Sequence, residues 1–363
     1  MNNSFLLYFS EMKDPRVDRA KRHLLNDILF ITIAAVLSGA DTWNDIADYG
    51  KSKIDWLSTV LELPEGIPSH DTFNRVFALI DAEEFEKIFI KWIKSIQQLP
   101  DNEFVSIDGK TLRGSRVTGS KEVTHIVSAW ADKNNLILGQ IKVDEKSNEI
   151  TAIPKLLDML MIKGTTITID AMGTQTKIAR KIVSKGADYI LAVKGNQGEL
   201  FDDIKDSFKV VDITDTHNDT DYGHGRIETR KCNIITDLSL VPSAIKWKAI
   251  KSIVHIKRTR YFKATGKEEK EDSYYISTHD NAEVIANGIR KHWGIENKVH
   301  WVLDVIFNED NSRKRAGNAA KNFTNVNRIA LNILRADDRN ISIRRKRNLA
   351  GWKNDYMEKL LKI

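Results

Sequence analysis

The sequence predicts a mixed α/β protein that begins with helices and carries a strand-rich insertion. Three observations support this prediction. Apolar residues recur at helical spacing before residue 100, strand-like and helix-like runs alternate between residues 105 and 193, and one long helical pattern covers residues 281–307. The chain has 363 residues, which exceeds one ordinary domain of about 150 residues.

The first hundred residues are predicted to be helical. Helical patterns cover His23–Gly39, Asp41–Gly50, Asp71–Ile80 and Glu83–Gln97. The second and third of these open with Asp followed by Thr, which is typical of a capped helix. Short helices of this kind suit a DNA-binding helix-turn-helix arrangement or a plain helical bundle, and the pattern favours neither.

Residues 101–199 are predicted to form a mixed sheet. Three strands come first, followed by a helix, a strand, a helix and a strand, which indicates a meander continued by crossover units. The predicted strands are Val105–Leu112, Thr124–Asp132, Leu136–Val143, Thr165–Ala171 and Tyr189–Val193, and the helices are Thr151–Lys163 and Gln175–Lys185.

Residues 200–280 are predicted to be a strand-rich insertion, with runs such as Trp247–His255 and Tyr274–Ser277 after an acidic loop. Asn281–Phe307 follows as a single long helix without proline. We therefore divide the chain into a helical domain at 1–100, the first part of the sheet domain at 101–199, the insertion at 200–280, a segment that completes the sheet domain at 281–335, and a basic tail at 336–363.

The charge of the chain is unevenly distributed. The net charge is +6, but residues 311–363 hold 14 Lys and Arg against 4 Asp and Glu, a net +10 that leaves −4 for residues 1–310. An acidic body with a basic end suits binding to nucleic acid, and affinity for it would then fall with salt.

Composition and the start of the chain exclude several classes of protein. Cys232 is the single cysteine, so neither an internal disulfide nor a cysteine-based zinc site is expected. The first residues lack the basic and apolar regions of a signal peptide. The longest apolar stretch, Ile28–Ala40, has 13 residues, too few to cross a bilayer, which needs about 20. We expect a cytoplasmic protein without a membrane segment.

Two aspartates occupy unusual places in the predicted strands. Asp108 lies within an apolar strand and Asp170 lies at the end of another, and glycines follow both at positions 109 and 173. Burying a carboxylate is costly unless it is paired or binds a cation, and a nearby glycine gives a ligand room to approach. The alternative for Asp170 is a structural one, in which its side chain caps the next turn.

A polar stripe is predicted on the long helix, because His292, Glu296, His300 and Asp304 recur every four residues. The stripe alone favours a solvent-exposed face, with a metal site as the alternative. Three acids from two strands and a helix suit Mg²⁺, while the histidines would also suit a transition metal. Neither a GxxxxGK[ST] nor a GxSxG motif is present, which argues against an ATP-driven motor or an α/β-hydrolase.

Four long motifs resemble the DDE transposases of bacterial insertion sequences, most closely the H-repeat-associated group. They are VSIDGKTLRGS at 105–115, TIDAMGTQTKIARKIVSKGADYILAVKGNQ at 168–197, GHGRIETR at 223–230 and HWGIENKVHWVLDVIFNED at 292–310. The run IPSHDTFNRVF at 67–77 is also similar to that group. The resemblance covers nearly the whole chain.

This resemblance implies a ribonuclease-H-like core in which Asp108, Asp170 and Glu296 are the catalytic acids and the ligands of two Mg²⁺ or Mn²⁺ ions. The supporting residues would be His292, His300 and Asp304. The wider family has a tyrosine, an arginine and a lysine around the third acid, where this chain has Ile289, His292 and Leu303, so contacts made by that triplet are not carried over.

The activity implied is cleavage at the ends of a mobile element and joining of the freed 3′ hydroxyl to target DNA. The alternatives are a DNA-binding protein that no longer catalyses and a metal-dependent nuclease without strand transfer. The partners would be double-stranded DNA, both terminal inverted repeats and target, bound by a homodimer or a larger assembly. The candidate DNA contacts are Lys110, Arg113, Lys194, Arg226, Arg344, Arg345, Lys346 and Arg347.

Overall fold

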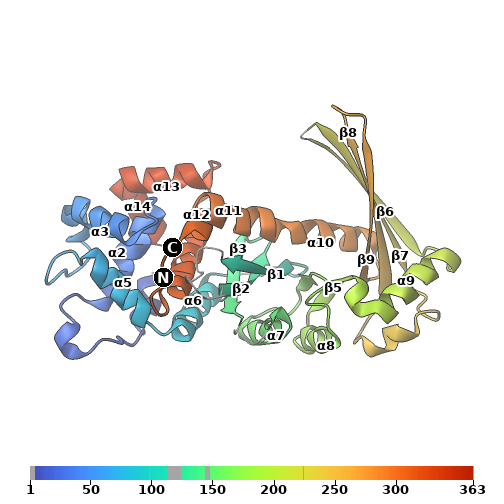
Figure 1. Ribbon diagram of the computed structural model, residues 1–363, viewed down its shortest axis with the longest axis horizontal. Coiled ribbons are helices and arrows are strands. Elements are labelled where there is room, and N and C mark those ends of the chain that lie inside the picture. The colour runs from blue at the N-terminus through green and yellow to red at the C-terminus, as the bar shows by residue number, and fades with distance from the viewer. Residues whose placement is uncertain (1–4, 98, 113–123, 144–147, 224, 363) are drawn as a thin grey trace.

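The structure is a computed structural model that describes residues 5–97, 99–112, 124–143, 148–223 and 225–362. The molecule is elongated and has three parts: helices at one end, a sheet in the middle and long strands that project at the other end (Figure 1). Both termini lie in the helical end. The chain therefore runs out to the projecting strands and returns along a long helix.

The helical end is a bundle around α2 (Leu25–Leu37), which is buried at 12 of its 13 positions. A helix that is apolar on every side is stable only when other helices surround it. The C-terminal helices complete this bundle around the N-terminal ones. Its other helices are α1 (Phe5–Phe9), α3 (Trp43–Ser52), α4 (Ile54–Leu57), α5 (His70–Leu79), α6 (Ala82–Ile96), α12 (Ala319–Ala336), α13 (Ile343–Trp352) and α14 (Asn354–Leu361).

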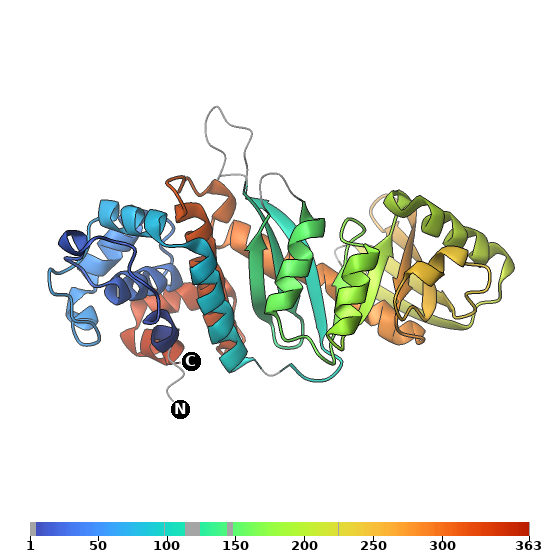
Figure 2. The same cartoon turned by 90° about the horizontal axis from the view of Figure 1, so that it is seen from below.

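The mixed sheet predicted for residues 101–199 is confirmed. Strand β1 pairs antiparallel with β2, which pairs antiparallel with β3, and β4 and β5 run parallel to β1. Helices α7 and α8 cover one face, and α10 crosses the other (Figures 1 and 2). The elements are β1 (Phe104–Leu112), β2 (Thr124–Ala131), β3 (Leu136–Lys142), α7 (Glu149–Met159), β4 (Thr166–Ile169), α8 (Thr176–Ser184) and β5 (Asp188–Val193).

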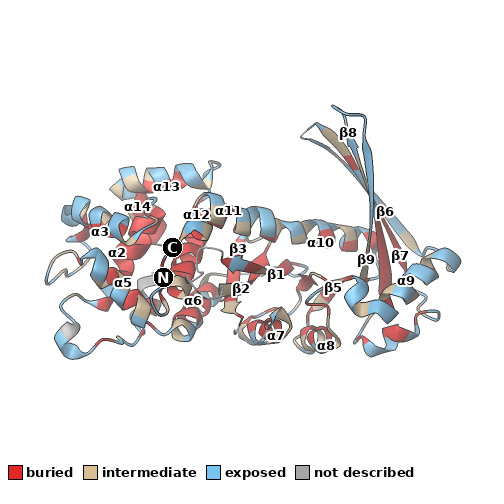
Figure 3. Ribbon diagram, in the orientation of Figure 1, coloured by how far each residue is buried: buried red, intermediate tan, exposed pale blue. Residues whose placement is uncertain are grey.

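The insertion extends this sheet instead of forming a separate one. Strand β9 pairs antiparallel with β5, which gives a sheet of nine strands in the described residues, in the order β3-β2-β1-β4-β5-β9-β8-β7-β6. The outer halves of β6 to β9 project away from the core and are largely exposed (Figure 3). The elements are α9 (Gly198–Val210), β6 (Asp215–Gly223), β7 (Arg226–Ile235), β8 (Ser252–Phe262) and β9 (Glu268–Ser277).

The long helix predicted for residues 281–307 is present, but its middle is not α-helical. Helix α10 (Ala282–Gly294) passes into a π-helical segment (Ile295–His300) and then into α11 (Trp301–Val305). Glu296 lies within the π-helical segment. Such widened turns in α-helices are rare and occur frequently at functional sites.

Most of residues 336–362, which we set apart as a basic tail, are helical. They fold into α13 and α14, which pack against α12, and α13 also packs against α2. Tyr356, Met357, Leu360 and Leu361 are buried there. The basic C-terminal end is therefore part of the helical bundle.

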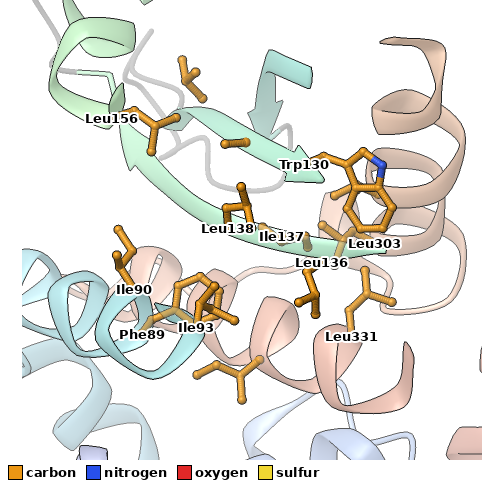
Figure 4. Close-up of a cluster of buried hydrophobic side chains, with 14 of the residues drawn as sticks. Phe89, Ile90, Ile93, Trp130, Leu136, Ile137, Leu138, Leu156, Leu303 and Leu331 are labelled. Atoms are coloured by element: carbon orange, nitrogen blue, oxygen red, sulfur yellow. The ribbon is translucent and has the colours of Figure 1, made fainter. Parts of the chain in front are cut away.

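One hydrophobic core joins the helical end to the sheet. Strand β3 contributes Leu136, Ile137 and Leu138, which lie between the sheet and helices α6 and α12 (Figure 4). The facing side chains come from α6, α11 and α12 and include Phe89, Ile93, Leu303 and Leu331. Because this contact is close-packed, the position of the sheet relative to the bundle is fixed.

In the part of the chain that the structure describes, no helix combines the length and the apolar character that crossing a membrane requires.

Candidate active site

Asp108 and Asp170 lie side by side because β1 and β4 are parallel neighbours. Ile107 on β1 pairs with Ile169 on β4, and each aspartate is the next residue along its strand. Gly173 donates its backbone N–H to Asp170 Oδ1 at 3.2 Å, so the turn-capping alternative for Asp170 is also observed. This hydrogen bond occupies one oxygen and leaves the carboxylate at the edge of a cavity.

Glu296 faces the same cavity from the other side. The cavity measures about 480 Å³, and its walls include Asp108, Asp170, Glu296, His292 and Lys194. Two of the acids come from the sheet and the third from the π-helical segment that crosses it. The structure thus brings together the three acids that the sequence motifs singled out.

The cavity holds negative charge that is only partly balanced. Burial, together with repulsion from Asp170, Glu149 and Glu296, raises the pKa of Asp108 to about 7, against a backbone hydrogen bond at Gly109 that lowers it. Burial also raises the pKa of Asp170 and of Glu296. Carboxylates in this condition gain strongly from a bound cation.

The polar stripe on the long helix faces the sheet, so our interpretation of it as a solvent-exposed face is wrong. His292 Nδ1 lies 2.9 Å from Thr168 Oγ1 on β4, and His300 Nδ1 lies 3.5 Å from Asp108 Oδ2 on β1. Burial lowers the pKa of His292 to about 4. Burial, then Lys110 and Arg328, lower the pKa of His300 to about 3. Both imidazoles are therefore neutral at neutral pH and do not balance the acids.

Asp304 is linked to β1 through Lys110. Lys110 Nζ forms ion pairs with Asp304 and with Glu309, the latter at 3.1 Å. Glu309 Oε1 in turn accepts from Arg328 Nη1 at 2.8 Å. Burial alone would raise the pKa of Glu309, but Arg328 and Lys110 hold it at about 2. This buried network joins β1 to the C-terminal end of the long helix.

The network occupies Lys110, which we predicted to be a DNA contact. Only 8% of the residue is exposed, and its ammonium group is used by two carboxylates. Sequence patterns could not pair Glu309 or Arg328 with Lys110, because their separation from Lys110 along the chain exceeds 190 residues. Only the fold brings them to β1.

Two further predicted DNA contacts, Lys346 and Arg347, also bond to groups inside the protein. Lys346 Nζ donates to the carbonyl oxygens of Leu334 and Asp337 at 3.0 and 2.6 Å. Arg347 Nε donates to the Val36 carbonyl at 3.0 Å, and its guanidinium also bonds the Ile306 carbonyl. Both side chains are buried inside the bundle, where they satisfy the ends of helices.

The remaining predicted contacts lie in three different places. Lys194 is exposed at the rim of the carboxylate cavity. Arg226 lines a second cavity, of about 720 Å³, between α10 and strands β6 to β8. Arg344 and Arg345 are exposed on α13. Arg113 lies outside the described residues.

The sequence motifs missed one acid near the site, Glu149 at the start of α7. Its Oε1 atom lies 2.6 Å from His125 Nε2 on β2, and it raises the pKa of both Asp108 and Asp170. An acid in the first turn of a helix is common and stabilising by itself. No local signal therefore distinguished Glu149.

The donor chemistry of the cavity fits Mg²⁺ or Mn²⁺, although the acids do not form a preassembled metal site. As they stand, no three His, Cys, Asp or Glu side chains of the described segments are close enough together to hold a metal ion. Hard divalent cations prefer carboxylate oxygens and retain water, so an open cavity with three acids suits them.

Family models and related proteins agree with the motifs. A model described as "Transposase DDE domain" matches residues 99–333, and one described as "DDE_Tnp_1-associated" matches residues 6–93. The chain is 42% identical to the Escherichia coli O157:H7 protein "Putative transposase YncI", over 99% of this chain and 94% of that protein. It is 41% identical to "H repeat-associated putative transposase YhhI" of Escherichia coli K12, over 98% and 96%.

The core sheet with its order β3-β2-β1-β4-β5, flanked by helices, is the ribonuclease-H-like arrangement that the sequence resemblance implied. The DDE domain match spans this sheet, the insertion and the long helix, and the associated match spans the helical end. Together with full-length identity above 40% to H-repeat-associated relatives, these findings show that the chain belongs to the DDE transposase family.

Proposed function

We propose that this protein cleaves double-stranded DNA at the ends of an insertion element and joins the freed 3′ hydroxyl to target DNA. The observation that carries the proposal is the convergence of Asp108, Asp170 and Glu296 on one cavity. In a member of the DDE transposase family, that convergence supports phosphoryl transfer assisted by two divalent cations.

Asp108, Asp170 and Glu296 would hold these Mg²⁺ or Mn²⁺ ions, which when bound offset charge on the phosphate and favour attack by a hydroxyl group. Asp108 is the acid that would act with both of the others in holding cations, because both Asp170 and Glu296 raise its pKa. His300 and the Lys110–Asp304 pair hold β1 and the helix in register around the acids. Lys194 at the rim is placed to contact a phosphate.

The rate gain in such a site comes mainly from positioning and from charge, since the protein forms no bond with the substrate. Burial of Asp108 and Asp170 in the sheet fixes two of the acids rigidly. Glu296 sits on a widened helical turn and is more exposed. We infer that Glu296 completes the site when DNA and cations are present.

The test is a cleavage and joining assay with element-end DNA, a supercoiled target plasmid and Mg²⁺ or Mn²⁺. The wild-type protein should yield joined products, and Asp108→Asn, Asp170→Asn and Glu296→Gln should each yield none. Equal activity of wild type and Asp108→Asn would rule out the proposed site.

The same assay separates the two alternatives. Cleaved but unjoined DNA would identify a nuclease without strand transfer, and a gel shift without cleavage would identify a protein that only binds DNA. A relative called "Inactive transposase YbfQ" from Escherichia coli K12, 50% identical over 15% of this chain, is named for a loss of activity. We expect activity here, because all three acids line the cavity.

Joining two element ends requires that both be held together, so we also propose that the protein acts as a homodimer or a larger assembly on DNA. Light scattering of the protein with and without element-end duplex would measure this. A single protein chain on each joined product would contradict it.

A further inference from the structure

A chain of hydrogen bonds leads from the edge of β1 to an acid beside the proposed catalytic site. Thr111 Oγ1 on β1 lies 2.9 Å from His125 Nδ1 on β2. His125 Nε2 lies 2.6 Å from Glu149 Oε1 at the start of α7. Glu149 and His125 are both largely buried, with 13% and 28% of their side chains exposed. The carboxylate of Glu149 is thus held in one place by His125, and the ring of His125 is held by Thr111.

Gly109 leaves the space that this carboxylate occupies. A Cβ atom at position 109 would overlap Glu149 Oε1 and would approach His125 Nε2 to 2.7 Å. Gly109 follows Asp108 directly. Because Gly109 has no side chain, Glu149 can lie against the backbone of β1 next to Asp108. The glycine has an ordinary negative φ, since it is not among the positions with positive φ. Its role is therefore to give clearance.

The charge of Glu149 reaches both aspartates of the sheet. After burial and local hydrogen bonds, it contributes to raising the pKa of Asp108 and of Asp170. It enters from the α7 side of the sheet, whereas Glu296 enters from the α10 side. Glu149 is not one of the walls of the cavity that holds the aspartates and Glu296, so it acts on the aspartates through its charge.

An acid that served only the first turn of α7 would need none of this arrangement. Near the start of a helix, a carboxylate stabilises the exposed N–H groups wherever it points. Glu149 instead bonds a histidine of a neighbouring strand, and a glycine makes room for it next to Asp108. The placement of Glu149 increases the repulsion among the acids. A bound cation would offset this repulsion, because each carboxylate attracts the cation.

We propose that Glu149 is a fourth carboxylate of the cation site: positioned by His125 and admitted by Gly109, it strengthens the binding of divalent cations at Asp108 and Asp170. This inference rests on the proposed function, because it assumes that these aspartates bind cations. Glu149 acts here through its field on the bound cation, so it is a positioning residue of the site.

The test measures Mn²⁺ binding to the full chain by electron paramagnetic resonance of unbound Mn²⁺, which does not depend on catalysis. Glu149→Gln keeps the shape of the side chain and an acceptor for His125 but removes the charge. We expect its affinity for Mn²⁺ to fall roughly tenfold. The matched control is Glu199→Gln, which removes an exposed carboxylate on α9 that pairs with Lys246, and its Mn²⁺ affinity should equal that of the wild type.

Two more variants separate charge from structure. Glu149→Asp restores the charge on a shorter side chain and should recover part of the affinity. Gly109→Ala should displace the carboxylate and weaken Mn²⁺ binding while Glu149 remains present. Thermal unfolding without metal should show that Glu149→Gln is folded. A purely structural defect would instead lower the Tm and leave the Mn²⁺ affinity of the folded protein unchanged.

The outcomes also distinguish this inference from the proposed function. If Asp108→Asn weakens Mn²⁺ binding and Glu149→Gln does not, the fourth carboxylate is wrong and the proposed catalytic site stands. If Glu149→Gln and Glu199→Gln weaken binding equally, the effect is one of overall charge and the inference also fails. If Asp108→Asn binds Mn²⁺ as the wild type does, both the proposed cation site and this inference are overturned.

Discussion

At the scale of single residues, the acids of the site are placed where they oppose the stability of the metal-free fold. Asp108 is buried, and its neighbours include three other carboxylates, Asp170, Glu149 and Glu296. Functional sites commonly retain such unfavourable groups because activity depends on them. The cost is expected to appear in the pH dependence of stability.

The first prediction concerns Asp108→Asn. The pKa of Asp108 is raised from 3.8 to about 7 in the folded protein. Ionisation therefore opposes folding, and the loss of stability develops as the pH rises from about 4 through 7. Without metal, the variant should be more stable than the wild type by at least about 1 kcal/mol at pH 8, and equally stable below pH 4. Urea unfolding in EDTA measures this.

The control for Asp108→Asn is Asp212→Asn, which changes an exposed acid away from the cavity. Its stability relative to the wild type should be the same at both pH values. If the wild type were as stable as Asp108→Asn at pH 8, the interpretation that the ionised carboxylate of Asp108 destabilises the fold would be contradicted.

The second prediction concerns Lys110→Met. The substitution keeps much of the side chain but removes the charge that faces Asp304 and Glu309. Because it leaves Asp304 without its cation and leaves the buried Glu309 with Arg328 as its remaining cation, the free energy of unfolding should fall by about 3 kcal/mol. Lys298→Ala breaks an ion pair with Asp132 in which the lysine is 45% exposed, and should cost less than about 1 kcal/mol. Similar losses for both would contradict the buried network.

At the scale of elements, the π-helical segment explains how the polar stripe stays on the sheet. In an α-helix, each step of four residues turns about 40° past a full circle, so His292 and Asp304 would diverge. A segment that bonds residue i to i+5 has more residues per turn and offsets this drift. In the structure, His292, His300 and Asp304 all contact residues of β4 or β1.

The third prediction concerns the deletion of Asn297, an exposed residue of the π-helical segment. Removing one residue allows ordinary α-helical bonding to continue, which turns His300 and Asp304 away relative to Glu296 by about 100°. The helix should remain, and cleavage should fall below detection. Circular dichroism and the plasmid assay measure the two effects. The substitution Asn297→Ala is the control and should stay active.

At the scale of the whole molecule, the basic C-terminal end is a structural component of the bundle that carries the sheet. Helices α13 and α14 pack against α12, and α13 against α2. The bundle shares its core with β3 of the central sheet. The position of the proposed catalytic site is therefore coupled to the packing of the C-terminal helices.

The fourth prediction is that a chain ending at residue 340 is destabilised. It loses the buried side chains of Tyr356, Met357, Leu360 and Leu361, and with them at least about 5 kcal/mol of hydrophobic stabilisation. Thermal unfolding should show a large fall in Tm or no cooperative transition. An unchanged Tm would restore the interpretation of this segment as a tail.

The fifth prediction concerns Arg344→Ala combined with Arg345→Ala, which removes exposed charge from α13 and keeps the fold. If these residues contact phosphates, DNA affinity should fall, and the slope of log affinity against log salt should decrease by about 2. The control pair, Lys209→Ala with Lys246→Ala, lies near α9 at the other end of the molecule. An unchanged slope in the α13 variant would remove these arginines from the DNA surface.

The sequence by itself determined the order of the core elements and the identity of the three acids. Periodicity in residues 105–193 is strong because each buried strand or helix must present apolar side chains at regular spacing. Asp108 and Asp170 were recognisable because a carboxylate within such a pattern is unusual. The motifs then identified Glu296 through a resemblance, although the helical pattern alone had favoured a solvent-exposed stripe.

Only the tertiary structure decided which charged residues are free. Lys346 and Arg347 belong to the same basic run as exposed Arg344 and Arg345, and Lys110 belongs to a strand, but the fold buries all three against carbonyl and carboxylate oxygens. Glu309 reaches Lys110, and Glu149 reaches His125, through contacts between separate elements. A sequence records the spacing of residues along one element, whereas burial and ion pairing depend on how separate elements meet, and that is fixed only when the core packs.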